Sequence, residues 1–306
     1  MYPPRRNILS GLLSLGLTSC LGSFEVHHLN NTLPYEKVTS QEEITKINFV
    51  HLNAADLRGN TPFLFEHISE EESRYRAKWL AEYWRGEGVD IASINEIDYA
   101  GTTKTGGLDQ PILIAEYLDE PYNYVVFDQY MKSPLWTTGN TVISRFPIKT
   151  VHRHLFGENP RSMDTRLGHL FKDFIHTEIG VGSKRLHLIT THFDNENAEF
   201  GFRKKEEAQE LAQYLFEFKQ KNPESYLVAA GDFNDDHDSE TLKIILSSGL
   251  YPPQENFGLK TYQNGNPTND LDHILASSNI KISNYRTFQF PWSDHLGLMC
   301  ELEFLN

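Results

Sequence analysis

Short apolar runs that end in a polar side chain recur along the chain, and they constrain its fold more than any other feature. The runs have the length of β-strands. The polar residues at or just beyond their ends are Asn53, Glu96, His192, Asp232, Asn234, Asp272, Asp294 and His295. Strands that share a sheet edge would bring these groups together. The sequence therefore predicts one polar cleft assembled from distant parts of the chain.

Amphipathic helices separate several of these strands. In 72–88, Ala77, Leu80 and Trp84 share one helix face, and two glycines end the helix. We predict further helices at 109–119, 203–218 and 239–247, and strands at 46–54, 89–94, 123–128, 139–148, 171–180, 185–192, 226–230, 271–276, 282–289 and 296–304. Adjacent strands mixed with crossover helices predict an α/β (α+β) fold, a four-layer sandwich of two packed mixed β-sheets flanked by helices. No second boundary is visible, so we expect one domain over 46–306.

Residues 1–19 are typical of a signal peptide, because two arginines precede an apolar stretch too short to span a bilayer. The sequence "LTSC" that ends at Cys20 resembles the bacterial lipobox, in which the signal is cut before the cysteine and that cysteine is lipidated. The alternative is an ordinary signal peptide in which Cys20 is incidental. We expect residues 20–45 to form a tether. The mature protein would then be lipid-anchored in the bacterial cell envelope, outside the cytoplasm.

The charge balance restricts the partners. Acidic residues outnumber basic ones by 42 to 28, for a net charge of −14 among 306 residues. A sequence-independent grip on DNA needs a basic face that displaces counterions. Nucleic acid is therefore disfavoured as a partner, although a local basic groove on an acidic body would still allow a nuclease. A small or neutral-headed substrate fits this balance better.

The polar strand ends are rich in carboxylates and include an amide and two imidazoles, but no cysteine. Oxygen-rich sets of this kind suit a hard divalent cation, typically Mg²⁺ or Mn²⁺. Zinc is less suited, because the chain has no HExxH motif and its histidines lack regular ligand spacing.

Seven short motifs occur in an informative order: "FVHLNA", "IASINE", "GNTVISRFPI", "ITTHFDN", "AAGDFND", "LDHIL" and "WSDHLGLM". Together they resemble the endonuclease/exonuclease/phosphatase superfamily over roughly residues 46–304. Each motif alone is weak, but their order is specific. The resemblance implies the DNase I-like fold and Mg²⁺-dependent hydrolysis of a phosphate ester by in-line attack of water.

The resemblance implies a metal site at the first two strand ends. Glu96 matches the metal-binding glutamate of the family, and Asn53 matches the neighbouring amide. Asp294 matches a carboxylate that binds the metal or orients its neighbours. Taken alone, Glu96 could be a solvated acid in a turn and Asn53 a turn or cap residue.

The remaining matches are catalytic residues. Asp232 matches the residue that orients or deprotonates the attacking water, and Asn234 could donate a hydrogen bond to a phosphoryl oxygen. His295 matches the imidazole that stabilises the transition state, with Asp272 accepting a hydrogen bond from its ring. His192 resembles the other histidine of the family's site, which contacts the phosphate. Without the family order, "GDFN" could be a turn followed by a helix cap, and His192 could be structural.

Substrate contacts are less defined. Asn140 and Arg145 could contact substrate, although Arg145 could equally be a surface salt-bridge partner. A later segment carries Arg153, Arg161 and Arg166, whose guanidinium groups suit a phosphate or another anion.

We expect loops that hold the substrate at 99–110, 128–138 and 152–168. The family contains both phosphodiesterases and phosphomonoesterases, and the matched residues do not decide between them. The favoured function is a phosphate-ester hydrolase that acts outside the cytoplasm as a monomer. The alternatives are an extracellular nuclease and a catalytically inactive binding or adhesion lipoprotein with the same fold.

The acidic stretch after the strand at 226–230 divides into two parts. Gly231 is expected to let the backbone turn sharply toward the site. Asp235, Asp236 and Asp238 are expected to cap the helix at 239–247, because a helix N-terminus favours negative charge.

Overall fold

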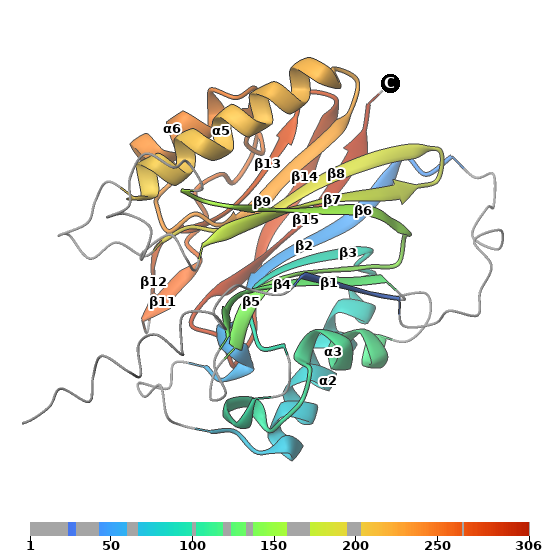
Figure 1. Ribbon diagram of the computed structural model, residues 1–306, viewed down its shortest axis with the longest axis vertical. Coiled ribbons are helices and arrows are strands. Elements are labelled where there is room, and N and C mark those ends of the chain that lie inside the picture. Colours follow the sequence, from blue (N-terminus) through green and yellow to red (C-terminus); the bar gives the residue numbers. More distant parts are fainter. Residues whose placement is uncertain are drawn as a thin grey trace, which may run out of the picture.

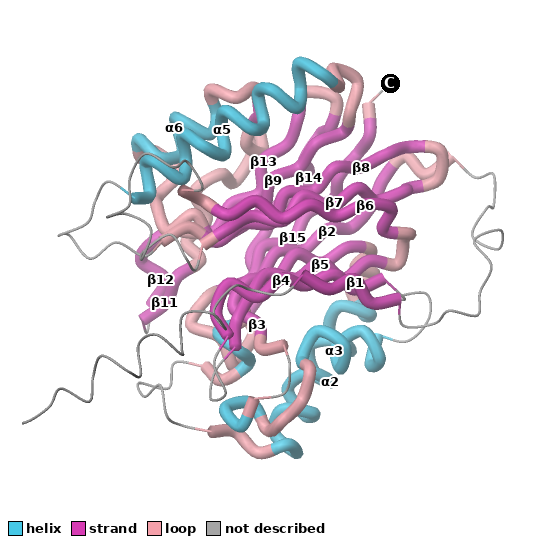
Figure 2. Tube along the Cα trace, in the orientation of Figure 1, coloured by secondary structure: helices cyan, strands magenta, loops and turns pink. Residues whose placement is uncertain are grey.

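The computed structural model describes residues 24–28, 43–59, 67–99, 102–118, 124–132, 137–157, 172–194, 203–264 and 266–305. Cys20, Arg161 and Arg166 lie outside these ranges, so the predictions for them stay predictions. Two β-sheets lie face to face, and helices cover the outer face of each (Figure 1). Figure 2 shows the same four layers by type of element, with the strands between the two groups of helices.

The larger sheet contains seven of the described strands. Their spatial order is β1 (Phe24–His28), β4 (Tyr124–Lys132), β5 (Thr137–Ser144), β3 (Ile91–Ile97), β2 (Lys46–Asn53), β15 (Leu296–Phe304) and β14 (Ile280–Gln289). The second sheet contains β10 (Leu250–Tyr251), β13 (Asp272–Ser277), β9 (Tyr226–Asp232), β8 (Lys184–His192), β7 (Asp173–Val181) and β6 (Ile148–Leu155). A short hairpin of β11 (Tyr262–Asn264) and β12 (Asn266–Asn269) completes the described strands.

Two parallel strand pairs position the polar strand ends. β2 pairs with β3, and β8 pairs with β9, while the other neighbours are antiparallel. Parallel neighbours need a crossover connection, which α2 (Glu70–Gly86) and α5 (Arg203–Lys221) supply. The two strands of each pair therefore end side by side. Asn53 is in register with Asn95, and His192 is in register with Asp232.

The start of α2 is fixed by a capping box. The Ser69 hydroxyl accepts from the backbone N–H of Glu72 at 3.1 Å, and the Glu72 carboxylate accepts from the backbone N–H of Ser69 at 3.0 Å. Its buried face, which includes Ala77, Leu80 and Trp84, packs on the larger sheet. The predicted face of this helix is confirmed.

Three apolar clusters fill the spaces between the layers. One lies between the two sheets, and it includes Phe49, Ile175 and Leu298. A second lies between the larger sheet and the helices α2 and α3 (Gln110–Leu118). The third lies between the smaller sheet and the helices α5 and α6 (Glu240–Leu246). The predicted class, two packed mixed sheets flanked by helices, is confirmed.

The sequence prediction missed the short strands β10, β11 and β12 and two longer strands. Residues 24–28, expected to be part of the tether, form β1 and pair with β4 at the edge of the larger sheet. Residues 148–155, of which 152–155 were expected to begin a loop, form β6 at the edge of the smaller sheet. Edge strands have one free side, so their sequences need not show an apolar alternation.

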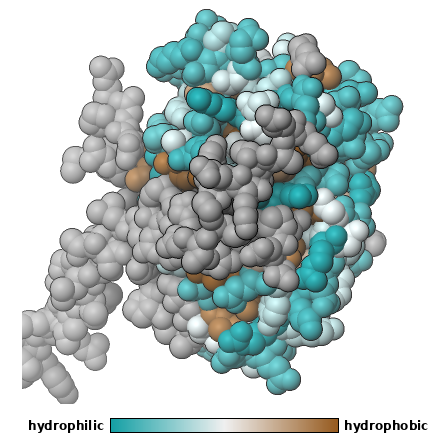
Figure 3. All heavy atoms as spheres, turned by 90° about the vertical axis from the view of Figure 1, so that its right-hand side faces the viewer, coloured by the Kyte–Doolittle hydropathy of each residue, from teal (hydrophilic) through white to brown (hydrophobic). Residues whose placement is uncertain are grey.

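The described surface is largely polar. Figure 3 shows hydrophilic residues over much of the described part of one face, interrupted by small hydrophobic patches. Among the helices that the structure describes, none has the length and apolar character needed to cross a membrane.

Candidate active site

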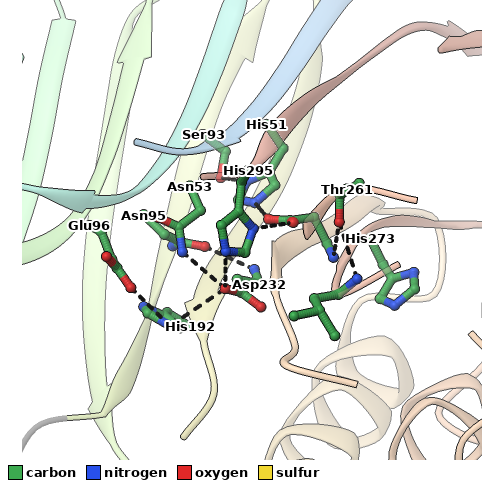
Figure 4. A network of polar contacts seen from close by, with 12 residues as sticks. His51, Asn53, Ser93, Asn95, Glu96, His192, Asp232, Thr261, His273 and His295 are labelled. Atoms are coloured by element: carbon green, nitrogen blue, oxygen red, sulfur yellow. Dashed lines mark hydrogen bonds and ion pairs between the residues drawn. The ribbon is translucent and has the colours of Figure 1, made fainter. Parts of the chain in front are cut away.

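Asp232 lies at the centre of a buried polar cluster where the edges of the two sheets meet (Figure 4). One carboxylate oxygen accepts a hydrogen bond from the Asn53 side chain at 2.9 Å, and the other accepts from the backbone N–H of Asn234 at 2.8 Å. Its own backbone N–H donates to the Asn95 side chain at 2.9 Å. Groups from both sheets therefore fix the position of Asp232.

His295 lies against Asp232 on one side and is paired with Asp272 on the other. Its Nδ1 is 2.7 Å from Asp272 Oδ2, and its Nε2 is 3.7 Å from Asp232 Oδ2. Burial alone would lower the pKa of His295, but the carboxylates of Asp272 and Asp232 outweigh it and raise the pKa to about 10. His295 is therefore a cation at neutral pH, with Nδ1–H donating to Asp272. The predicted Asp272–His295 hydrogen bond is present.

His192 lies on the other side of Asp232. Its Nε2 is 3.7 Å from Asp232 Oδ2 and 3.7 Å from Glu96 Oε1. Burial lowers the pKa of His192 well below its usual value, and the positive charge of Lys172 lowers it further. His192 is therefore neutral at physiological pH, unlike His295.

Glu96 lies at the outer end of this cluster with 36% of its side chain exposed. Even so, desolvation by the surrounding protein raises its pKa to about 7, and the charge of Asp56 raises it in the same direction. Lys172 and His295 oppose the shift only in part. The carboxylate is thus poorly compensated by the positive charges around it.

Two of the site residues adopt an unusual backbone conformation. Glu96 has φ 47° at an irregularity in the β3–β5 pairing, and Asn234 has φ 52° directly after β9. Non-glycine residues rarely adopt positive φ, and such strain is concentrated at functional sites. The irregularity redirects the Glu96 side chain at the end of the strand.

Gly231 acts differently from the prediction. It lies inside β9, and a Cβ atom at this position would come 2.1 Å from the carbonyl oxygen of Thr191. The glycine is needed because β8 and β9 approach closely, rather than because the chain turns. The positive φ in this segment belongs to Asn234 instead.

Asn234 lies beside Asp232 as expected, but its side chain is already engaged. Its amide nitrogen donates to the carbonyl oxygen of Phe193 at 2.8 Å. At least one of its two N–H groups therefore holds the segment after β8. Its role toward a phosphoryl oxygen stays a prediction.

The predicted helix cap was wrong. Ser239 caps α6, with its hydroxyl accepting from the backbone N–H of Leu242 at 3.2 Å. The Asp236 carboxylate instead accepts from the backbone N–H of Asp270 at 3.0 Å. The interaction with the Asp270 side chain, followed by this backbone bond, lowers the pKa of Asp236. The backbone bond also fastens the segment after β9 to the residues just before β13.

The predicted substrate residues fall into separate places. Asn140 is buried at the site, where its side chain accepts from Asn95 at 2.6 Å and donates to Asp173 at 2.9 Å. Arg145 lies just beyond the opposite end of β5 and pairs with Asp90 at 2.7 Å. The structure therefore does not bring Arg145 to the cluster, and the salt-bridge alternative describes its position.

The structure also describes the positions of Arg153 and Asp294. Arg153 lies on β6, where its Nε donates to Asp173 at 2.7 Å, so it forms an ion pair within the protein. Asp294 is half-buried and helps to raise the pKa of His295 and of Tyr262. Its backbone carbonyl accepts from Gln263 at 2.8 Å, which ties it to β11.

The prediction from sequence missed three residues of the cluster. Asn95 precedes Glu96 and bonds to both Asp232 and Asn140. Tyr262 places its ring 5.1 Å from that of His295. His51 binds the second oxygen of Asp272 at 3.1 Å. Asn95 and His51 stand inside the quoted motifs, so position within the motif was the only signal for them, and Tyr262 carried none.

The donor set around Glu96 fits a divalent cation. The Glu96 carboxylate lacks sufficient compensating charge, and the Asn53 amide oxygen supplies a second oxygen donor on the adjacent strand. A second possibility is the group of Asp232, Asp272 and His295, whose ligand atoms lie within 4.8 Å of one another. In that group, however, the protonated ring of His295 already supplies the positive charge. Both groups are candidate cation sites, and the Glu96 side has less positive charge around it.

Comparisons with solved structures identify the architecture. An endonuclease/exonuclease/phosphatase from Beutenbergia cavernae superposes with a TM-score of 0.65 at 16% identity, over 86% of this chain and 72% of that one. A mannosyl-6-phosphatase from Bacteroides thetaiotaomicron gives a TM-score of 0.58 at 16% identity, over 84% and 100%. A humanized TDP2 from D. rerio gives 0.57 at 14% identity, over 85% and 99%. The comparison with curated proteins found no match.

The layered sheets with this site at their edge define a DNase I-like hydrolase fold. The sequence profile of the endonuclease/exonuclease/phosphatase family matches residues 67–295, more than half of the chain. The protein belongs to this family, whose members generally hydrolyse phosphoester bonds. Asn53 lies before the matched residues and enters the site through the pairing of β2 with β3.

Proposed function

We propose that the protein is a divalent-metal-dependent hydrolase of phosphate esters. The observation that carries this proposal is the setting of Asp232, a buried carboxylate with a neutral imidazole on one side and a protonated imidazole on the other, each 3.7 Å away. A carboxylate held in this way can accept a proton from water, and the cationic imidazole can stabilise charge on a phosphoryl group.

The pKa shifts divide the roles. Burial and the charge of Asp272 raise the pKa of Asp232, which brings it closer to the value that suits a base near neutral pH. Water attacks phosphorus, its proton passes to Asp232, and the bond between phosphorus and the leaving oxygen breaks. Protonated His295 stabilises the charge that develops on the phosphoryl oxygens. Neutral His192 lies where it can contact the same group.

Glu96 and Asn53 would hold the cation. When bound, a divalent cation polarises phosphoryl oxygens and neutralises part of their charge. The Glu96 side chain is 36% exposed, so a cation that it held would be accessible to a substrate from solvent.

A substrate panel tests the proposal. Plasmid DNA, RNA, sphingomyelin, inositol phosphates and bis(4-nitrophenyl) phosphate would be compared with Mg²⁺, with Mn²⁺ and with EDTA, using soluble protein that starts after Cys20. We expect turnover of at least one phosphate ester, loss of turnover in EDTA and recovery with Mg²⁺. Binding without turnover of any ester would support the inactive binding protein instead, and preferred cleavage of nucleic acid would support the nuclease.

We also propose that the enzyme acts from the cell envelope through a lipid on Cys20, on the basis of the "LTSC" sequence alone. Cys20→Ala should then move the protein from the membrane fraction to the soluble fraction. Unchanged fractionation of this variant would contradict the anchor and leave the proposed chemistry intact.

A further inference from the structure

A chain of buried polar side chains continues from Asp272 into the space between the two sheets. Asp272 Oδ2 binds the catalytic candidate His295, and Oδ1 lies 3.1 Å from His51 Nε2. His51 Nδ1 lies 3.3 Å from Ser93 Oγ, which lies 3.0 Å from Thr190 Oγ1. His51 and Ser93 lie on β2 and β3 of the larger sheet, whereas Asp272 and Thr190 lie on the smaller sheet.

The direction of the hydrogen bond between His51 and Asp272 follows from the charge of Asp272. An ionised carboxylate only accepts hydrogen bonds, so the Nε2–H of His51 donates to it. The other ring nitrogen of His51, Nδ1, shares a hydrogen bond with the hydroxyl of Ser93, and that hydroxyl shares one with the hydroxyl of Thr190. Each member of the chain thereby has a partner, as buried polar groups require.

His51 completes the hydrogen bonding of Asp272. The His51 and Asp272 side chains are both 0% exposed, so bulk water does not reach the hydrogen bond between them. Without His51, Oδ1 would lose its ring N–H donor in a buried place. The carboxylate could then rotate, and the Nδ1–H of His295 would lose its fixed acceptor. Figure 4 shows His51 close behind His295, on the side away from Glu96.

We propose that His51 is a positioning residue that holds Asp272 so that His295 faces Asp232. His51 acts on the reaction only through Asp272 and His295. The inference rests on the proposed function for its kinetic consequence, but the hydrogen bond between Asp272 and His295 can be observed without any substrate.

The test compares His51→Leu, which removes the donor, with His51→Gln, whose amide N–H can replace Nε2–H. Turnover of bis(4-nitrophenyl) phosphate with Mg²⁺ would be measured well below the unfolding temperature. We expect kcat of His51→Leu to fall about 10–100-fold, as for other residues that orient a site residue, with KM changed less than about threefold. His51→Gln should recover most of the lost kcat. His187→Gln is the matched control, because His187 is a buried histidine that packs against α5, outside the site.

A spectroscopic measurement separates positioning from a merely structural role. In protein labelled with ¹⁵N-histidine, the Nδ1–H of His295 should give a strongly downfield signal, assigned by its loss in His295→Gln. We expect this signal to shift or broaden in His51→Leu and to return in His51→Gln. A lower unfolding temperature with unchanged kcat and unchanged signal would overturn the inference, because His51 would then only fill the core.

Two outcomes need a second variant or readout. If His51→Leu does not fold, Ser93→Ala tests the same chain by removing the hydroxyl that binds His51 Nδ1. Wild-type kcat and signal in Ser93→Ala would then overturn the inference, whereas reduced values of both would support it. If the wild-type protein hydrolyses none of the esters, the proposed function fails, and the His295 signal alone decides the role of His51.

Discussion

The two sides of Asp232 are held in different ways. On the Asp272 side, His295 and His51 are buried. They bind the two carboxylate oxygens of Asp272 at 2.7 and 3.1 Å. On the Glu96 side, His192 lies 3.7 Å from each carboxylate, and Glu96 is 36% exposed with a pKa raised to about 7. Between these described residues, the contacts are short on the Asp272 side and longer on the Glu96 side.

The two sides also differ in how far their charges are balanced within the protein. The Asp272 side already contains its positive charge, the protonated ring of His295, so its geometry is fixed before substrate arrives. The Glu96 side has acidic groups whose charge is only partly balanced. A divalent cation and a phosphate would complete it. We therefore expect the Asp272 side to be preorganised and the Glu96 side to depend on a bound ligand.

The largest effect is expected at the residue between the two sides. Asp232→Asn keeps the shape of the side chain but removes the proton acceptor. We expect kcat to fall about 10²–10⁴-fold, the usual contribution of a general base, in steady-state assays with Mg²⁺. Glu82→Gln, at an exposed carboxylate on α2, is the control and should keep wild-type kcat. Full activity in Asp232→Asn would remove Asp232 from the mechanism, provided that circular dichroism shows both variants folded.

The next largest effect concerns the stabilisation of the folded protein by a bound cation, which should depend on the Glu96 side and not on the Asp272 side. Saturation to about 100 times Kd should stabilise the folded protein by about 2.7 kcal/mol, which raises the unfolding temperature by roughly 5–10 °C for a domain of this size. Differential scanning calorimetry with and without Mg²⁺ would measure this shift. Glu96→Gln should abolish the shift, and His295→Gln should keep it. The reverse result would place the cation in the group of Asp232, Asp272 and His295.

A smaller effect concerns pH in the absence of metal. The pKa of Glu96 is raised in the folded protein, because desolvation and Asp56 favour the protonated form, while Lys172 and His295 oppose this shift. Its contribution to stability is therefore fully present below the usual glutamate pKa and is lost as pH rises through about 7. The partial exposure of Glu96 reduces the size of the effect.

Urea unfolding in EDTA at pH 5 and pH 7.5 measures this loss. We expect the wild-type protein to lose more stability than Glu96→Gln over this interval, because the amide does not titrate. The raised pKa of His295, about 10, also lowers stability as pH rises above the usual histidine pKa, but both proteins carry this residue, so its contribution cancels in the difference between them. Equal losses in both proteins would show that Glu96 is already compensated without a cation.

The same contrast explains what the sequence could predict. Most central strands and the helices of the layers were predictable, because each must bury an apolar face and its periodicity shows this, whereas the edge strands β1 and β6 were missed. The Asp272–His295 bond followed from the family motifs. His51 and Asn95 were quoted in those motifs yet received no role, because their partners lie on other strands. Pairing between sheets is a tertiary property that no local pattern records.

Local rules also failed where tertiary contacts decided. Asp236 stands at a suitable position for a helix cap, but the backbone of Asp270 offers its N–H, and Ser239 caps the helix instead. Gly231 suggested a turn, although the crowding by Thr191 across two parallel strands is what excludes a side chain there. In each case the residue type was informative, and the reason for it lay in a contact with another part of the chain.

The smallest expected effect concerns Arg145, which the sequence left open between substrate contact and salt bridge. Its side chain is 44% exposed, and its guanidinium forms an ion pair with Asp90 at 2.7 Å. Arg145 lies just beyond the C-terminal end of β5, away from Asn140. Arg145→Ala should therefore change kcat/KM less than about twofold, because no ligand at Glu96 is within its reach. It should lower the free energy of unfolding by about 1 kcal/mol or less, as for other exposed ion pairs. A tenfold rise in KM with unchanged stability would instead show that the substrate extends along the sheet to Arg145, far beyond both sides of Asp232.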